Sequence, residues 1–139
     1  MDIFTTLGVK ESDAEIVADV LVTADLMGIS SHGVQRVERY VNGIECGAVN
    51  TNPDMRLIVD YGAVGVLDAD NGLGQVAALR AILHAVEKAR VFGVGVVLVR
   101  RSHHYGIAGY YALKAVEHGM IGVSMTNSEA LVAYIGTVE

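Results

Sequence analysis

The stretch that decides the fold is Arg101-Ser102-His103-His104-Tyr105-Gly106-Ile107-Ala108-Gly109-Tyr110-Tyr111. It joins residues 94–99, an apolar run that predicts a buried strand, to residues 107–118, whose spacing predicts a helix. Such a junction holds a loop still while leaving its tip open to ligands. Histidine exchanges protons near neutral pH, so His103 and His104 are candidate functional side chains, although in an arbitrary pair one ring usually packs and the other is solvated.

Regular elements extend from this junction in both directions. The sequence predicts a helix from the Ser12–Glu15 capping box to Gly28, a helix over 34–46, strands over 55–60 and 63–68, a helix over 75–91, a strand over 94–100, a helix over 107–118 and a strand over 120–126. This order fits a mixed α/β sheet. The turn at residues 51–54 divides a helical segment, 1–52, from an α/β domain, 53–139.

Composition narrows the class of protein. The 139 residues are 52% hydrophobic, which excludes disorder and fits one domain or part of a larger one. The net charge of -6, without a Lys/Arg cluster, argues against nucleic acid as a partner. No apolar run reaches the roughly 18 residues that span a bilayer, so we expect no membrane partner. The single cysteine, Cys46, suits a reducing cytoplasm.

The last residues predict an incomplete domain. Residues 131–135 are apolar, and the sequence stops four residues later without a segment to cover them. Such a segment indicates truncation, which we favour, or burial against another subunit.

A second histidine lies between the two N-terminal helices, in Ser30-Ser31-His32-Gly33, and is followed by Arg36 and Tyr40. On one helix Arg36 and Tyr40 would share a face, because they are four residues apart. Helix-opening N–H groups, a guanidinium and a tyrosine hydroxyl would together bind a carboxylate. The alternative is that Ser31 only caps the helix and Arg36 is solvated.

Several blocks of this sequence are similar to those of a known enzyme family. They are Ala24-Asp25-Leu26-Met27-Gly28-Ile29-Ser30-Ser31-His32-Gly33-Val34-Gln35-Arg36 with Tyr40, Asp68-Ala69-Asp70-Asn71-Gly72-Leu73-Gly74-Gln75, residues 102–111, Gly119-Met120-Ile121-Gly122 and Met125-Thr126-Asn127-Ser128. The chain resembles the type-2 malate/L-lactate dehydrogenases, a family that includes ureidoglycolate, sulfolactate and diketogulonate oxidoreductases and a reductase of cyclic imino acids.

The resemblance implies a fold, a reaction and a set of site residues. It implies a non-Rossmann nicotinamide-binding fold, NAD or NADP as cofactor, a small 2-oxo or 2-hydroxy acid as substrate, and a homodimer. His104, ranked first, and His32 are then the catalytic acid–base residues. The substrate-binding residues are Ser31, Arg36 and Tyr40, and the cofactor-binding residues are Thr126, Asn127 and Ser128.

Two positions depart from the family pattern, and family members are far longer than this chain. His103 stands where the family usually has a small polar residue, and Tyr134 where it usually has proline. Much of the dinucleotide contact would come from the part that this sequence lacks.

Other interpretations remain open. Residues 72–77 fit G-x-G-x-x-A, but Asp68 and Asp70 precede them and would repel a pyrophosphate, so a Rossmann loop is not expected. Residues 68–72 lack the spacing of a calcium loop. A metal hydrolase using His32, His103 and His104 lacks a nearby carboxylate with ligand spacing, and no metal site is predicted. An inactive fragment that only associates with other chains is the main competitor.

Overall fold

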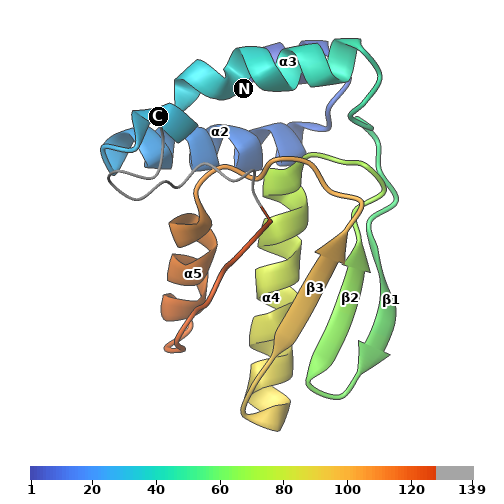
Figure 1. Cartoon of the computed structure of the whole chain (residues 1–139), viewed down its shortest axis with the longest axis vertical. Coiled ribbons are helices and arrows are strands. Elements are labelled where there is room, and N and C mark those ends of the chain that lie inside the picture. The colour runs from blue at the N-terminus through green and yellow to red at the C-terminus, as the bar shows by residue number, and fades with distance from the viewer. Residues whose placement is uncertain (128–139) are drawn as a thin grey trace, which may run out of the picture.

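The computed structural model describes residues 1–127 and has a mixed α/β fold in which a small sheet lies against helices (Figure 1). The elements in chain order are α1 (Asp2–Thr6), α2 (Glu11–Leu26), the 3₁₀ turns η1 (Ser30–His32) and η2 (Val34–Arg36), α3 (Val37–Glu45), β1 (Arg56–Tyr61), β2 (Val64–Asp68), α4 (Gly74–Phe92), β3 (Val96–Arg100) and α5 (Ala108–Val116). The predicted mixed α/β class is confirmed.

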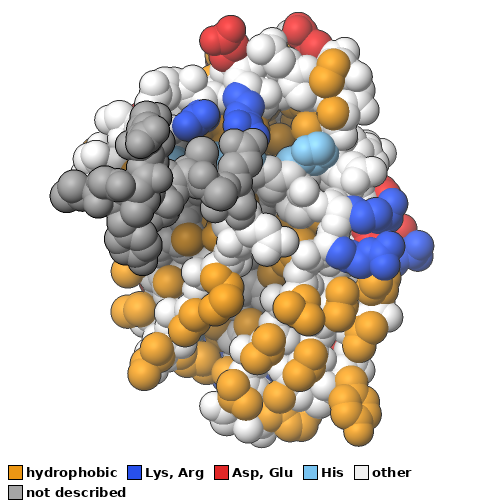
Figure 2. All heavy atoms as spheres, in the orientation of Figure 1, with side chains coloured by type: hydrophobic (Ala, Val, Ile, Leu, Met, Phe, Trp, Pro, Cys, Tyr) orange, Lys and Arg blue, Asp and Glu red, His pale blue; other side chains and the backbone are white. Residues whose placement is uncertain are grey.

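The sheet has the order β1-β2-β3. Strands β1 and β2 form the predicted antiparallel hairpin, and β3 pairs in parallel with β2 after the α4 crossover. Helix α4 packs against one face of the sheet, where Leu67 is buried. On the other face Val64, Val96 and Leu98 are exposed in the described part of the chain, because no element there covers them. Figure 2 shows hydrophobic side chains gathered over this part of the surface.

The prediction of a buried strand over residues 94–99 is therefore wrong in two respects. Strand β3 begins only at Val96, and most of its residues are exposed. Its apolar composition suggested burial on both faces, but β3 is an edge strand with α4 on one side only. The predicted strand over residues 120–126 is also absent, since these residues pair with no described strand, and Ile121 is 96% exposed.

Two helix starts differ from the prediction. Helix α2 begins at Glu11 with Lys10 as N-cap, so the Ser12 side chain makes no capping hydrogen bond. The expected helix from residue 34 begins only at Val37, after two 3₁₀ turns. The carboxylate of Asp25 accepts the backbone N–H of Val34 at 2.9 Å and holds the chain in these turns.

Two clusters of buried side chains meet at α2. The first contains Phe4, Val17, Leu21, Tyr40, Leu73 and Val76 with neighbouring residues, and the second contains Val20, Ala24, Ile107, Tyr110 and Tyr111. Helix α2 thus packs toward α4 with one part of its surface and toward α5 with another (Figure 1). Within residues 1–127 no helix has the length and apolar character needed to cross a membrane.

Candidate active site

The two histidine stretches meet in space although they are far apart in sequence. Tyr40, on α3, and His104, in the loop after β3, place the tyrosine hydroxyl 2.7 Å from Nδ1 of the imidazole. The ring of His32 stacks on that of His104, with centroids 5.5 Å apart and planes inclined by 23°. Both candidate acid–base residues are therefore in direct contact, and Tyr40 joins them.

Ser31 contacts the second of these histidines. Its hydroxyl lies 3.0 Å from Nδ1 of His32, and it makes no capping hydrogen bond to η1 or η2. Ser31 therefore orients the His32 ring in this structure, and the alternative interpretation of Ser31 as a helix cap is wrong.

The environment keeps His104 and Tyr40 neutral at pH 7. Partial burial, with smaller effects of Arg39, His32 and Arg36 in that order, lowers the pKa of His104 to about 4. Burial raises the pKa of Tyr40 to about 12, against the opposing effects of Gln75, Arg39 and Arg36. A neutral imidazole hydrogen-bonded to a neutral phenol is the resting state of the pair.

Two arginines lie beside this pair. Arg36 donates from Nε to the backbone carbonyl of Ser31 at 2.6 Å, which leaves its terminal nitrogens without a described partner. Arg39 lines a small pocket together with Tyr40, His103 and His104. Arg39 thus joins the predicted residues, and its adjacency to Tyr40 in the sequence was a signal for it. His103, already a candidate from its place beside His104, lines the same pocket.

The loop that carries His104 is anchored on both sides. His103 donates from Nε2 to the backbone carbonyl of Ala48 at 2.9 Å, which ties the loop to the segment after α3. A Cβ at Gly74 would lie 2.1 Å from the carbonyl oxygen of His103, so only glycine lets α4 start this close to the loop.

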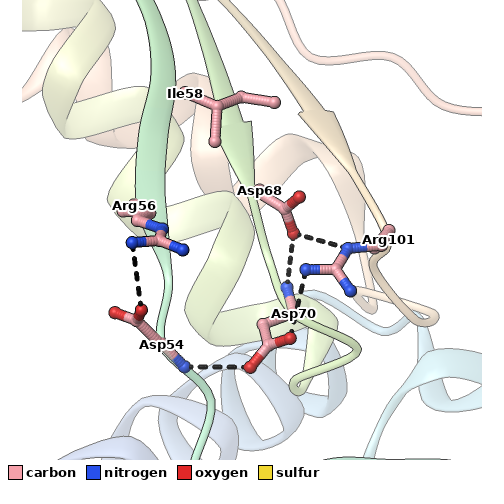
Figure 3. A pocket seen from close by; sticks show the side chains of 6 residues that line it. All are labelled: Asp54, Arg56, Ile58, Asp68, Asp70 and Arg101. Carbon is pink, nitrogen blue, oxygen red and sulfur yellow. Dashed lines mark hydrogen bonds and ion pairs between the residues drawn. The ribbon is translucent and has the colours of Figure 1, made fainter.

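An ion-pair network fixes the start of the same loop (Figure 3). Arg101 donates to Asp68 at 2.8 Å and to Asp70 at 3.1 Å, while Asp68 also accepts the backbone N–H of Asp70 at 2.9 Å. Arg101 adopts φ of +50°, a left-handed conformation that is uncommon for residues other than glycine. The hydrogen bond from Arg101 holds the pKa of Asp68 below its usual value.

The Gly72–Gly74 loop is filled by protein and does not fit a pyrophosphate. The space beside Gly74 is occupied by backbone of residues 103 and 104, and the acidic side chains of Asp68 and Asp70 precede the loop. The residues expected at the cofactor are only partly described. Thr126 and Asn127 are exposed at the end of the described chain, and Ser128 lies outside the described residues. This loop therefore supplies no pyrophosphate cradle.

The three candidate metal-binding histidines are not arranged around one point. His32 and His104 stack face to face, and the Nε2 atom of His103 is engaged by Ala48. Over residues 1–127 no group of three or more His, Cys, Asp and Glu side chains has the geometry to hold a metal ion.

Fold and site together define an α/β protein in which Arg39, Tyr40 and His104 line one pocket and the ring of His32 stacks on that of His104, as expected for a hydroxy-acid oxidoreductase. The chain belongs to the malate/L-lactate dehydrogenase family, whose sequence pattern matches residues 1–139. The malate dehydrogenase of Pyrococcus horikoshii is 56% identical over 137 residues, which are 99% of this chain and 38% of that protein. The L-sulfolactate dehydrogenase of Methanocaldococcus jannaschii is 43% identical over 139 residues, all of this chain and 40% of that protein.

Solved structures give the same result. The structure of malate dehydrogenase from Pyrococcus horikoshii matches with a TM-score of 0.92 at 55% identity, over 99% of this chain and 40% of that one. The sulfolactate dehydrogenase from Methanocaldococcus jannaschii matches with a TM-score of 0.83 at 44% identity, over 84% of this chain and 34% of that one. The chain thus spans about two fifths of the length of the curated relatives it matches.

Proposed function

We propose that this chain supplies the acid–base and carboxylate-binding part of the active site of an NAD(P)-dependent 2-hydroxy acid dehydrogenase. The observation that carries the proposal is the contact of Tyr40 with His104, beside the stacked ring of His32. Family membership gives the reaction class, and relatives named for malate and sulfolactate suggest a substrate with a second acidic group. We further propose a homodimer in the cytoplasm, with NAD and NADP both as candidate cofactors.

In this proposal His104 exchanges the proton of the substrate's 2-oxygen. Proton transfer must accompany carbon–hydrogen bond changes, because an unneutralised charge on that oxygen is costly in a desolvated site. A positioned imidazole contributes on the order of 100- to 10,000-fold to such a step. His32 is the second candidate, since its ring contacts the first.

The two arginines are suited to carboxylates. A guanidinium binds a carboxylate through two parallel hydrogen bonds, which fixes the substrate carbon in place. The terminal nitrogens of Arg36 have no partner among residues 1–127 and suit this contact, and Arg39 lines the pocket itself. We assign the 2-carboxylate to Arg36 and a second acidic group to Arg39, with Ser31 holding His32 beside them.

When bound, a nicotinamide would supply or accept the hydride. Thr126, Asn127 and Ser128 are the residues of this chain that we propose to contact it. The Gly72–Gly74 loop offers no place for the pyrophosphate, so we propose that this contact comes from another part of a longer chain or from a second subunit.

One observation favours a second candidate function, association with another chain. Three apolar side chains after α5 are largely exposed, Ile121 by 96%, Val123 by 69% and Met125 by 81%. One face of the sheet is also left uncovered in the described part of the chain. Large exposed apolar patches mark interaction surfaces. This reading predicts an oligomer that depends on concentration and no binding of small acids.

The test is ligand binding by the 139-residue chain. Oxaloacetate and pyruvate are titrated while the imidazole signals are followed by NMR, and NADH and NADPH are titrated by fluorescence. We expect oxaloacetate to shift the His104 signal in a saturable manner and to bind more tightly than pyruvate, with the preference reduced in Arg39→Met. No shift with either acid, in a chain that circular dichroism shows to be folded, would contradict the proposal.

A further inference from the structure

Two hydrogen-bond donors converge on the same nitrogen of His104. The hydroxyl of Tyr40 lies 2.7 Å from Nδ1, and the backbone N–H of Gly106 points at Nδ1 from 3.3 Å. A backbone N–H can only donate, so Nδ1 must present its lone pair. In a neutral imidazole the proton is then on Nε2, and Tyr40 is the donor in its contact with the ring.

The backbone turn at Gly106 makes this assignment specific. Gly106 has φ of +83°, which turns its N–H back toward the preceding imidazole, and a Cβ there would lie 2.8 Å from Val20. Both the conformation and the lack of space require glycine at this position. The donor to Nδ1 is therefore built into the backbone and does not depend on a mobile side chain.

The buried side-chain amide of Gln75 lies near the Tyr40 hydroxyl. Gln75, in the first turn of α4, has 0% of its surface exposed. Its side-chain nitrogen and oxygen are the only fully buried side-chain polar atoms without a hydrogen-bond partner in residues 1–127. Gln75 lies near enough to Tyr40 to lower the pKa of its hydroxyl, although the two side chains make no hydrogen bond in this structure. Because Tyr40 uses its proton toward His104, its oxygen is free to accept from that amide.

We propose that Gln75, Tyr40 and His104 form a chain of donors that fixes His104 as the Nε2–H form. The Gln75 amide donates to the Tyr40 oxygen, Tyr40 donates to Nδ1, and His104 presents Nε2–H to the substrate oxygen. Gln75 and Tyr40 are positioning residues in this arrangement. The role of Nε2 toward a substrate rests on the proposed function, whereas the tautomer does not.

The arrangement defines the path of one proton in the reducing direction. A bound reduced nicotinamide would supply the hydride to the carbonyl carbon, and the carbonyl oxygen takes the Nε2 proton. The Tyr40 proton moves to Nδ1, so the imidazole stays neutral while Tyr40 becomes a phenolate near Arg36 and Arg39. Water returns a proton to the phenolate. This path needs no imidazolium, which is scarce at pH 7 in this environment.

The first test reads the tautomer directly. Two-bond ¹H–¹⁵N NMR spectra of the 139-residue chain at pH 7, without cofactor or substrate, distinguish Nδ1–H from Nε2–H, and His104→Gln assigns the signal. We expect the Nε2–H pattern for His104. Tyr40→Phe should raise the Nδ1–H share roughly two- to tenfold, the effect of one lost hydrogen bond. Tyr110→Phe, which removes another buried phenol, is the control and should leave the share unchanged.

The second test isolates Gln75. Gln75→Met keeps the size of the side chain and removes both polar atoms, and Gln35→Met is the control on an exposed glutamine. We expect only Gln75→Met to shift the ring-carbon signal of Tyr40 and to raise the Nδ1–H share of His104.

Three outcomes decide between the proposals. An Nδ1–H ring in the unsubstituted chain overturns the donor chain, even where oxaloacetate binds. Unchanged Tyr40 and His104 signals in a folded Gln75→Met variant remove Gln75 from it. An Nε2–H ring that responds to Tyr40→Phe, in a chain that binds no acid, supports the donor chain and rejects the proposed function.

Discussion

The low pKa of His104 makes stability depend on pH in a way that one substitution should remove. Its pKa falls from 6.5 to about 4 on folding, chiefly through burial. The unfolded chain therefore binds more protons than the folded chain between these values, so this residue contributes stability that is complete above pH 6.5 and is lost as pH falls toward 4. The whole shift corresponds to about 3.4 kcal/mol before allowance for solvent screening.

Most of that loss is measurable at a pH where the chain should still fold. Between pH 7 and pH 5 the linkage amounts to about 2 kcal/mol, and screening of a half-exposed ring reduces this to about 1 kcal/mol. Guanidinium unfolding followed by circular dichroism gives the free energy of unfolding, which suits a chain without tryptophan. We expect unsubstituted protein to lose about 1 kcal/mol more than His104→Gln over this interval.

The loss of stability between pH 7 and pH 5 is compared between the unsubstituted chain and His104→Gln. This comparison cancels the contribution of carboxylates, because they titrate in both proteins. His84→Gln, on the exposed side of α4, controls for the loss of a surface imidazole. If His104→Gln and the unsubstituted chain lose the same free energy within about 0.3 kcal/mol, the argument from burial and neighbouring cations is refuted.

Three further substitutions test the packing around the site. Gly74→Ala should cost about 1–3 kcal/mol and shift the backbone signals of His103, because its Cβ would meet that residue's carbonyl oxygen; a normal unfolding curve with unchanged signals would contradict this. Leu21→Ala should cost roughly 2–5 kcal/mol in guanidinium unfolding, since Leu21 is buried in the first core cluster. Arg101→Gln removes the partner of Asp68 and Asp70, and we expect altered amide signals in the loop after β3 with no change in helix content by circular dichroism.

Local sequence signals were sufficient for the elements whose ends are fixed by local chemistry. The β1–β2 hairpin follows from two short apolar runs around Gly62, and α4 ends where Gly93 adopts a left-handed conformation. The start of α3 was missed because it depends on the carboxylate of Asp25, nine residues before the N–H that it accepts. The strand over residues 120–126 was predicted from its apolar composition, but strand formation also needs a partner strand.

The residues of the candidate site also divide into those that the sequence indicated and those that only the structure brought out. The resemblance brought His32, His104 and Tyr40 together, and the structure places them in contact. Gln75 gave no comparable signal as a site residue, because its importance comes from its burial near Tyr40. Arg39 had only its adjacency to Tyr40 in the sequence, because the pocket that it lines forms only when α3 and the loop after β3 meet. The sequence made His103 a candidate functional side chain beside His104, and the structure ties its Nε2 atom to the backbone carbonyl of Ala48. The assignments of catalytic and substrate-binding roles stay predictions.

Helix α2 contributes side chains to both core clusters, so the candidate site is attached to the packing that holds the described fold together. Its residues Val17 and Leu21 belong to one cluster, and Val20, which also lies against Gly106, belongs to the other. His32 lies in η1, a short turn after this helix, while Gly106 in the loop of His104 lies against Val20 of the helix. Opening either histidine segment therefore disturbs packing that holds the described fold together, so the amides around both should exchange with solvent almost as slowly as global unfolding permits.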